Sequence, residues 1–295
     1  MTSTDLETLA RWRTIGARHS EEVIELGLKV LKSGRLGDQE WALREQLAIA
    51  ALDLGQNDLS QAQINLLHRK FPDSPRVKIL DGLLLESKGK VNEAKDVYDN
   101  LLKIDETNIS ALQRLISLTI SSSSTSSSSA AIPLLLKYLD IFYSDPSGWS
   151  LLSELYCEQG MYLQALDSIS HLLVIQPWDE NNVRRAGEIA YTAGDYQLSL
   201  KHLLRALEMQ GDKQTNVNPK RTRIWWGIKL AVSRLLESSN LNQIETSVPI
   251  EMRTTEKQLK LLDELSTEKI LQYGGGKGIN LEVKRKVLSG DVVVR

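Results

Sequence analysis

The sequence predicts an all-α fold, a solenoid of stacked helical hairpins, and three observations support this prediction. Glycines recur at a spacing of 34 residues, Gly55 with Gly89 and Gly160 with Gly194. The apolar residues are mainly leucine and alanine, with only two phenylalanines, a mixture that favours helices. Proline stands where a helix would end, as at Pro177. A period of 34 is that of the tetratricopeptide repeat. The predicted fold class is therefore a tetratricopeptide-repeat α-solenoid, a right-handed superhelix of hairpins.

The repeat pattern is fullest in segment 146–179. In the required order this segment carries Trp149, Leu152, Ser153, Tyr156, Gly160, Tyr162, Ala165, Ile169 and Pro177. Three other segments keep part of it: 41–74 has Ala48, Gly55 and Pro72; 75–108 has Gly82, Gly89, Ala94 and Tyr98; 180–213 has Gly187, Gly194, Tyr196 and Ala206. Four segments in one register indicate a repeat array and argue against a helical bundle with accidental spacing.

Certain positions of the pattern are predicted to hold the hairpins together. A small residue at the eighth place of the first helix lets the second helix approach closely, and a glycine after the first helix allows the chain to turn. Aromatic residues on one face fill the space between hairpins. The expected repeat-packing residues are Gly55, Gly82, Gly89, Trp149, Tyr156, Gly160, Ala165, Gly187 and Gly194.

Two helices are predicted before the repeats, in a capping region at residues 1–40. The first is opened by Thr4, with Glu7 completing a capping box. The second runs from Ser20 to Lys32. The repeats are predicted to occupy 41–237, as about five units plus a partial one.

The third unit is interrupted. Its first helix is expected at about 108–120, and a Ser/Thr-rich run follows at 121–129. Such a run is too polar to pack in a core, so we predict a flexible insertion within the domain. Ala131 then takes the alanine place of the repeat, which indicates that the helices resume in phase.

The C-terminal part is less regular. A polar spacer ends at Pro219, and the next helix carries Trp225 and resembles the first helix of a sixth, diverged unit. A further helix is predicted from about Thr254 to Leu271. Residues 238–295 are thus predicted to form a C-terminal helix and a flexible tail.

Composition excludes several classes of function. The net charge of −2 argues against a nucleic-acid-binding domain, which usually has a basic excess. The one cysteine, Cys157, cannot form an internal disulfide and is expected to be a small packing residue. The four histidines have no zinc-ligand spacing, and the run Gly274–Gly278 lacks the spacing of a phosphate-binding loop. We therefore predict no enzyme activity, cofactor, metal or small-molecule substrate.

Nothing in the sequence resembles a segment that enters a membrane. The N-terminus lacks the apolar core of a signal peptide. Apolar runs such as 130–136 are much shorter than the roughly 18 residues that a membrane span needs. The sequence therefore predicts a soluble, cytoplasmic protein.

The function expected of such a stack is protein binding, because the first helices of successive hairpins line a concave surface. The predicted partner-binding residues of this surface are Ile79, Leu83, Gln113, Glu154, Arg184, Glu188, Tyr191 and Trp225. Chaperone-binding tetratricopeptide domains hold a terminal carboxylate with basic and amide side chains at corresponding places. Here those places hold Glu45, Ile49, Ile79 and Leu83, so a carboxylate clamp is not predicted.

Several stretches resemble one family, subunit 2 of the endoplasmic-reticulum membrane protein complex. They are Ile49-Ala50-Ala51-Leu52-Asp53, Gly55, Asp58-Leu59, Phe71-Pro72-Asp73-Ser74, Arg76-Val77-Lys78, Tyr98, Asp105, Thr107, Asn108, Trp149, Glu154-Leu155-Tyr156 and Pro177. The resemblance covers roughly 41–237. The sequence departs from the family at Glu106, in the serine run and after about residue 240.

This resemblance implies a non-catalytic scaffold subunit on the cytosolic side of the complex. Such a subunit would be peripheral to the endoplasmic-reticulum membrane, which it would contact only through its partners. The complex would insert transmembrane segments, including those of tail-anchored proteins. Two alternatives stay open: a free tetratricopeptide adaptor or co-chaperone, and an auxiliary subunit of a soluble enzyme.

Overall fold

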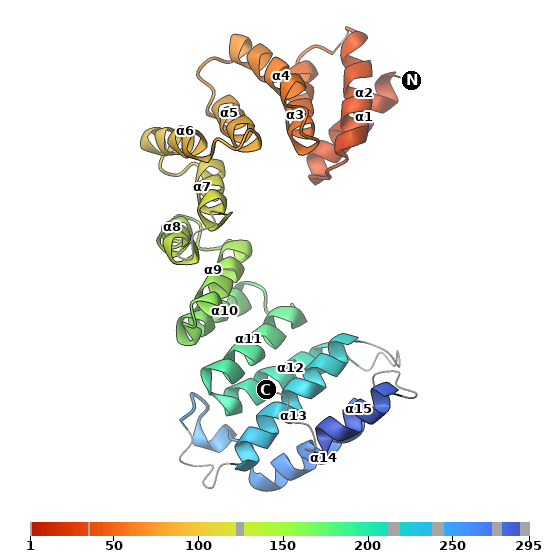
Figure 1. Cartoon of the computed structure of the whole chain (residues 1–295), viewed down its shortest axis with the longest axis vertical. Coiled ribbons are helices and arrows are strands. Elements are labelled where there is room, and N and C mark those ends of the chain that lie inside the picture. Colours follow the sequence, from red (N-terminus) through yellow and green to blue (C-terminus); the bar gives the residue numbers. More distant parts are fainter. Residues whose placement is uncertain are drawn as a thin grey trace. The chain divides into compact units, whose positions relative to one another are not determined.

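The computed structural model describes residues 2–34, 36–121, 127–211, 219–237, 245–272 and 279–289. Within these ranges the chain contains only α-helices, one short 3-10 helix and the turns between them. The chain divides into two compact units, residues 1–134 and 135–295, and the division falls within α8 (Ser127–Ile141) (Figure 1).

Unit 1 contains three hairpins and a further helix before α8. Its helices are α1 (Thr2–Ile15), α2 (Ser20–Lys32), α3 (Gln39–Asp53), α4 (Asn57–Lys70), α5 (Pro75–Ser87), α6 (Val91–Ile104) and α7 (Ile109–Ser121). Each helix packs against the next along the chain, and α3 also contacts α5. The unit is therefore a stack of antiparallel hairpins in which neighbouring first helices lie side by side.

Unit 2 continues the hairpin pattern and ends in an irregular group of helices. Its elements after α8 are α9 (Pro146–Glu158), α10 (Tyr162–Ile175), α11 (Glu180–Ala193), α12 (Tyr196–Met209), α13 (Pro219–Glu237), η1 (Ile250–Met252), α14 (Glu256–Gln272) and α15 (Ile279–Leu288). Consecutive α-helices from α9 to α15 pack together, and α11 also contacts α13. The predicted all-α architecture of repeated helical hairpins is confirmed.

Close packing inside a hairpin is most evident at Gly82 of α5. A Cβ atom at this position would lie 2.4 Å from the ring of Tyr98 on α6. The Tyr98 side chain is fully buried, and its hydroxyl donates a hydrogen bond to Glu86 at 2.5 Å. Burial, together with this carboxylate partner, raises the pKa of the Tyr98 phenol. Glycine at position 82 therefore makes room for a ring that is held at both its edge and its hydroxyl.

The corresponding position in unit 2 is Gly187 of α11. A Cβ atom there would lie 2.9 Å from Cγ of Leu203 on α12. The turn that follows α11 is closed by Gly194, whose φ of 92° lies in the left-handed region, where glycine is favoured. The same hairpin thus uses one glycine for close approach and another for the turn.

The other predicted packing residues lie at the hairpin contacts. Trp149 stacks on His171 with ring centroids 4.3 Å apart, and Ala165 is fully buried. Tyr156 is half-buried against the core cluster of α10 and α11 that contains Ala165. Gly55, Gly89 and Gly160 have positive φ angles in the turns between helices. The predicted packing side chains therefore lie at contacts between helices, and these three predicted glycines lie in the turns.

The ends of several elements differ from the prediction. Ser121 ends α7 and Ser127–Ser129 begin α8, so these parts of the predicted insertion are helical, and residues 122–126 lie outside the described residues. α1 begins at Thr2 rather than at a Thr4 cap. Helices α5 and α9 both begin with proline after a residue of a type that can cap a helix. Asp145 accepts a hydrogen bond from the backbone N–H of Ser147 and so caps α9, whereas Ser74 makes no side-chain cap at α5.

The predicted domain boundaries at 40 and 237 do not coincide with the two units. α2 packs against α3, and α13 packs against α14, so helices on both sides of each boundary share a core. Residues 279–288 form α15 where a flexible tail was predicted. The rest of that tail, 273–278 and 290–295, lies outside the described residues.

Asp195, the residue before α12, joins the C-terminal segment to the repeats. Its carboxylate accepts hydrogen bonds from the N–H of Leu198 (2.9 Å), the hydroxyl of Thr246 (2.6 Å) and both the N–H and hydroxyl of Ser247 (2.8 Å each). We call these contacts the Asp195 clasp. The buried Gln197 adds a hydrogen bond from the N–H of Thr254 at 3.1 Å. The segment from Thr246 to Thr254 is therefore fixed to the start of α12.

Candidate partner-binding surface

Unit 1 has a groove along its first helices. It runs over α3, α5 and α7 and has a volume of about 680 Å³. Its lining residues are Glu45, Ile49, Ser74, Pro75, Arg76, Ile79, Leu80, Leu83, Asn108, Ser110, Gln113, Arg114 and Ser117. These include the predicted binding residues Ile79, Leu83 and Gln113. The wall from α3 and α5 is largely apolar but also carries Glu45 and Arg76, whereas the wall from α7 is polar, with hydroxyl and amide groups and Arg114.

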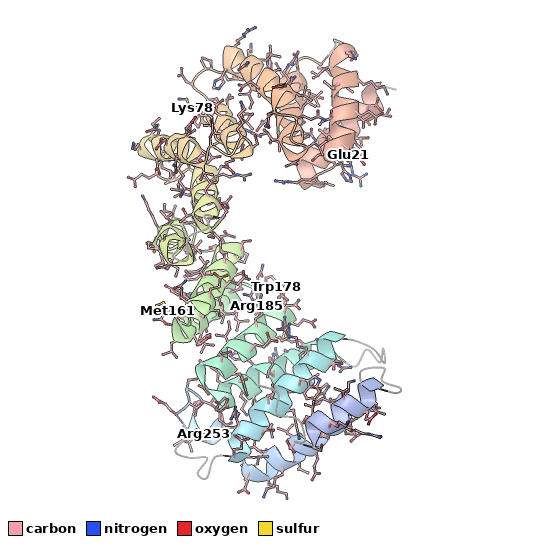
Figure 2. The ribbon with its side chains drawn as sticks, viewed as in Figure 1. Glu21, Lys78, Met161, Trp178, Arg185 and Arg253 are labelled. Atoms are coloured by element: carbon pink, nitrogen blue, oxygen red, sulfur yellow. The ribbon has the colours of Figure 1, made fainter. Side chains whose placement is uncertain are left out.

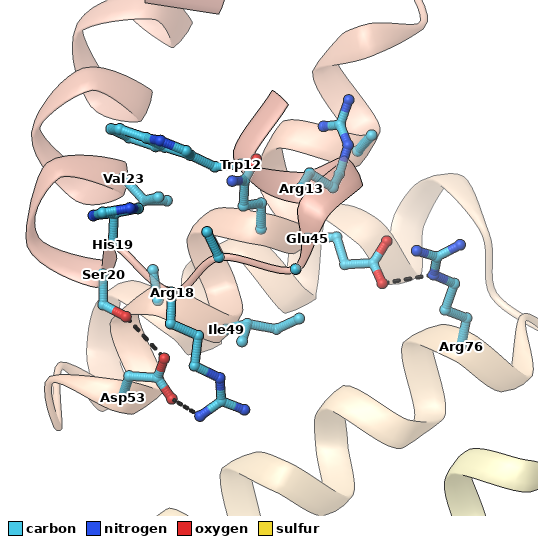
Figure 3. Close-up of a pocket in the computed structure, with 15 residues that line it drawn as sticks. Trp12, Arg13, Arg18, His19, Ser20, Val23, Glu45, Ile49, Asp53 and Arg76 are labelled. Atoms are coloured by element: carbon cyan, nitrogen blue, oxygen red, sulfur yellow. Dashed lines mark hydrogen bonds and ion pairs between the residues drawn. The ribbon is translucent and has the colours of Figure 1, made fainter. Parts of the chain in front are cut away.

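A smaller hollow continues the groove toward the N-terminus (Figure 3). It has a volume of about 260 Å³ and shares Glu45, Ile49 and Arg76 with the groove. Trp12 stacks on His19 at its edge, with ring centroids 4.5 Å apart. Together the two spaces provide a continuous lining of α1–α3, α5 and α7, which suits an extended chain better than a compact small molecule.

Ion pairs at the rim of this hollow fix its shape. Asp53 accepts hydrogen bonds from Ser20 (2.8 Å) and from Arg18 (3.3 Å), as Figure 3 shows. Glu45 pairs with Arg76 at 2.6 Å where the hollow meets the groove. These charged side chains already pair with one another, so the rim presents little unpaired charge to a binding segment.

The pairing of Glu45 with Arg76 recurs between other neighbouring first helices. In each case a glutamate of one first helix contacts an arginine of the next. The pairs are Glu45–Arg76 (2.6 Å), Glu86–Arg114 (3.8 Å), Glu154–Arg185 (2.9 Å) and Glu188–Arg223 (2.7 Å). An exposed pair contributes only about 0–1 kcal/mol to stability. The main effect of these pairs is therefore on the electrostatic potential of the surface that the first helices form, because its charges alternate in sign and are paired.

The predicted residues of unit 2 lie in two different environments. Glu154 and Glu188 line a shallow hollow over α9 and α11, together with Arg185. Arg184 donates to Glu188 at 2.5 Å. Tyr191 is half-buried, tilts against Tyr196 at 5.3 Å and packs on the C-terminal core.

Trp225 was predicted to face a partner, but the structure buries it. Only 6% of its surface is exposed, and it lies in a core cluster with Ile228 of α13 and with Leu259 and Ile270 of α14. The physical reason is that α13 packs against both α12 and α14, and Trp225 lies within the core that these helices share. The inner surface available to a partner in unit 2 is thus formed by α9 and α11.

Sequence reasoning missed the arginines of the ion pairs. Arg76, Arg114, Arg185 and Arg223 lie about one repeat after the glutamates they contact. A search for opposite charges at this separation would have found them.

Cys157, predicted as a small packing residue, is half-buried against the core of α9–α11, and burial raises the pKa of its thiol.

The described residues contain no cluster of three or more His, Cys, Asp or Glu side chains arranged to hold a metal ion. Among the same residues, no helix has the length and apolar character to span a bilayer. The geometry described above offers surfaces for polypeptides, and the groove of unit 1 is open to solvent.

Comparisons with known proteins agree with this description. The EMC2 TPR-like repeat domain family matches residues 66–202. The chain is 34% identical over 208 residues to ER membrane protein complex subunit 2-A of Xenopus laevis, with 69% of each chain covered. It is 29% identical to TPR repeat protein oca3 of Schizosaccharomyces pombe, covering 70% of this chain and 72% of that one.

Among solved structures, the C-terminal part of a TPR repeat-containing protein from Cytophaga hutchinsonii is similar in fold. Its TM-score is 0.60 at 15% identity, with 95% of this chain and 98% of that chain covered. At this identity the likeness shows the tetratricopeptide fold alone.

Proposed function

The chain belongs to the family of ER membrane protein complex subunit 2, and from this premise we propose that it is a non-catalytic scaffold subunit of such a complex. It would lie on the cytosolic side, peripheral to the endoplasmic-reticulum membrane, and contact the membrane through partner subunits. Through the complex it would support the insertion of transmembrane segments, including those of tail-anchored proteins.

The groove of unit 1 is the observation that carries this proposal. It presents apolar side chains from α3 and α5 opposite the hydroxyl and amide groups of α7. An extended partner segment needs both, because its apolar side chains must be buried and its backbone must find hydrogen-bond partners. The paired charges at the rim favour such a segment over a charged chain end.

A single substitution in the groove tests the proposal. Ser117 of α7 is exposed in the groove, and its hydroxyl donates to the carbonyl of Gln113 at 2.8 Å. We expect Ser117→Arg to fill the groove with a long charged side chain while leaving the fold intact. Recovery of the membrane subunits after detergent purification should fall at least about tenfold, which corresponds to 1.4 kcal/mol of binding free energy.

Thr14 of α1 provides a matched control. It is also exposed, and its hydroxyl donates to the carbonyl four residues earlier, at 3.0 Å from Ala10. Thr14→Arg should therefore leave recovery unchanged. Full assembly of the Ser117→Arg protein would rule out the groove as the contact. If the unaltered chain brought no membrane subunit through detergent, a free adaptor or an enzyme-associated subunit would be favoured instead.

A further inference from the structure

The hairpin of α9 and α10 has an unusual charge. Residues 138–183 contain no lysine or arginine, although the whole chain contains 36 basic and 38 acidic residues. The same stretch contains seven carboxylates: Asp140, Asp145, Glu154, Glu158, Asp167, Asp179 and Glu180. Asp145 and Asp179 cap helices, and Glu154 pairs with Arg185. The surface of this hairpin is therefore strongly acidic.

The outward face of α10 is apolar as well as acidic. Leu163 is 70% exposed, Val174 is 82% exposed and Trp178, just after the helix, is 74% exposed. Asp167 and His171 lie between them at helical spacing and are also exposed. We call these five residues the α10 face. Figure 2 shows Met161, the residue before α10, and Trp178 at opposite ends of the helix.

This exposure is not a consequence of a poorly packed helix. The opposite side of α10 is well buried, with Ala165 and Ile169 fully buried and Leu172 at 1% exposure. Scattered exposed apolar residues are ordinary, whereas Leu163, Val174 and Trp178 follow one side of one helix, with Asp167 and His171 between them. Large apolar side chains gathered on one exposed face and flanked by polar groups indicate an interaction surface. From Leu163 to Val174 the row extends about 16 Å, at 1.5 Å per residue.

Aromatic groups of α9 and of the turn before it extend the same surface. Trp149 stacks on His171, and its indole N–H donates to the carbonyl of Tyr143 at 2.7 Å. The Tyr143 side chain is 72% exposed. Exposed tryptophan and tyrosine side chains are the types that contribute most binding energy at protein interfaces.

We propose that the α10 face binds a basic, amphipathic helix of a partner protein. The apolar row would pack against the apolar stripe of that helix, and the surrounding carboxylates would attract its lysine and arginine side chains. A row of about 16 Å matches two to three helical turns of the partner. An anionic membrane surface is disfavoured, because the carboxylates would repel its head groups.

This surface is separate from the groove of unit 1, with which it has no residue in common. A subunit with both surfaces can hold two polypeptides at once, an extended segment in the groove and a helix on α10. The proposal does not depend on the groove, and either one can fail while the other stands.

The test uses the full chain and two fluorescein-labelled peptides of about 18 residues, or about five helical turns. Both have the same leucine stripe, and their polar positions are all lysine in one peptide and all glutamate in the other. By fluorescence anisotropy the lysine peptide should bind at least tenfold more tightly. Its affinity should fall as salt is raised, because exposed charges are then screened.

Variants assign this binding to α10. Val174→Ser combined with Trp178→Ser should lower the affinity for the lysine peptide at least tenfold. Both side chains are exposed, so the fold should be unchanged, and circular dichroism checks this directly. Leu230→Ser on α13, where leucine is 49% exposed, and Ser117→Arg in the groove should leave binding unchanged. Equal binding of the two peptides, or full binding by the α10 variant, would overturn the proposal.

The assembled complex provides a second readout. Benzoylphenylalanine, a photoreactive amino acid, would be placed at position 174 in a complex purified from cells. It should cross-link to a segment of a partner protein, which mass spectrometry identifies. The sequence of that segment should have apolar residues at helical spacing and be rich in lysine or arginine. Cross-linking to lipid, or to a segment without basic residues, would contradict the inference.

Discussion

Replacing Gly82 with alanine is expected to lower the free energy of unfolding by about 1–3 kcal/mol, the usual cost of overpacking a core. The new Cβ atom would lie 2.4 Å from the Tyr98 ring, and this ring is fully buried and held by a hydrogen bond to Glu86. Urea unfolding followed by circular dichroism measures the effect. Gly82→Leu should be more severe.

Gly27→Ala in α2 is a matched control, since Gly27 is also buried within a helix. There the new Cβ atom would meet Leu47 at 3.4 Å and Leu43 at 3.6 Å, close to ordinary contact. The higher helix propensity of alanine should then make the protein as stable as before or more stable by up to about 1 kcal/mol. Two Gly→Ala changes with opposite signs are the expected result. Equal effects would show that Tyr98 does not fill the space at Gly82.

A double-mutant cycle would assign the cost to one contact. Tyr98→Leu removes the ring that the new methyl group meets, so Gly82→Ala should cost less in that background than alone. A coupling of at least about 0.5 kcal/mol is expected for side chains in direct contact. Additive effects would place the strain elsewhere in the hairpin.

Replacing Asp195 with alanine is expected to be the second large effect, at about 2–4 kcal/mol. The change removes the helix cap, which is worth about 1 kcal/mol, and the hydrogen bonds from Thr246 and Ser247 to a charged group, worth about 1.5–3 kcal/mol. Asp179 supplies the control, because it caps α11 through Asn181 without holding a distant segment. Asp179→Ala should cost only about 1 kcal/mol. Equal losses at the two positions would show that the clasp adds nothing to the cap.

The same residue predicts a pH dependence. Burial alone would raise the pKa of Asp195, but its hydrogen bonds from Thr246, Ser247 and Leu198 outweigh burial and hold the pKa below the ordinary value of 3.8. A carboxyl group with a lowered folded-state pKa stabilises the protein above its unfolded-state pKa, and this stability is lost as the pH falls through the folded value. The stability gap between the unaltered protein and Asp195→Asn should therefore be constant near neutral pH and narrow below 3.8. A gap that stays constant into that acid range would contradict the prediction.

The repeated hairpins could be predicted from the sequence because their signal is periodic. Glycine at places such as 82, 160 and 194 answers a local need for space or for a turn, and that need recurs every 34 residues. The places that line the groove are periodic as well, since Ile79 and Gln113 are 34 residues apart on successive first helices. Local chemistry repeated at a fixed spacing is what a single sequence reveals best.

The C-terminal region could not be predicted in the same way, because its packing is neither local nor periodic. Trp225 looks like a groove residue until α14 is placed against α13, and α14 carries none of the repeat's glycine or aromatic positions that would have indicated this packing. α15 has no repeat equivalent to compare with. The helical part of the serine run was missed because serine composition favours loops, whereas the apolar residues after Ser129 continue the helix.

The acidic character of the hairpin that contains α10 is visible in the sequence, but the repeat pattern does not indicate it. The repeat pattern specifies the side of α10 that packs, and it says nothing of Leu163, Val174 and Trp178 on the other side. The absence of basic residues from 138–183 was visible in the sequence. A charge profile along the chain would have drawn attention to this hairpin.

The Asp195 clasp also has a consequence for how the protein is made. Asp195 and Ser247 are 52 residues apart, and ribosomes add about 5–20 residues per second. Roughly 3–10 seconds therefore pass between the synthesis of the carboxylate and that of its partner. During this interval α12 has its local cap from Asp195 to Leu198, but the polar groups of Asp195 and Gln197 that hold the later segment still face water. A nascent chain stalled between these points would keep complete hairpins at its N-terminus and an unfinished last repeat, which is the form that quality-control factors would meet first.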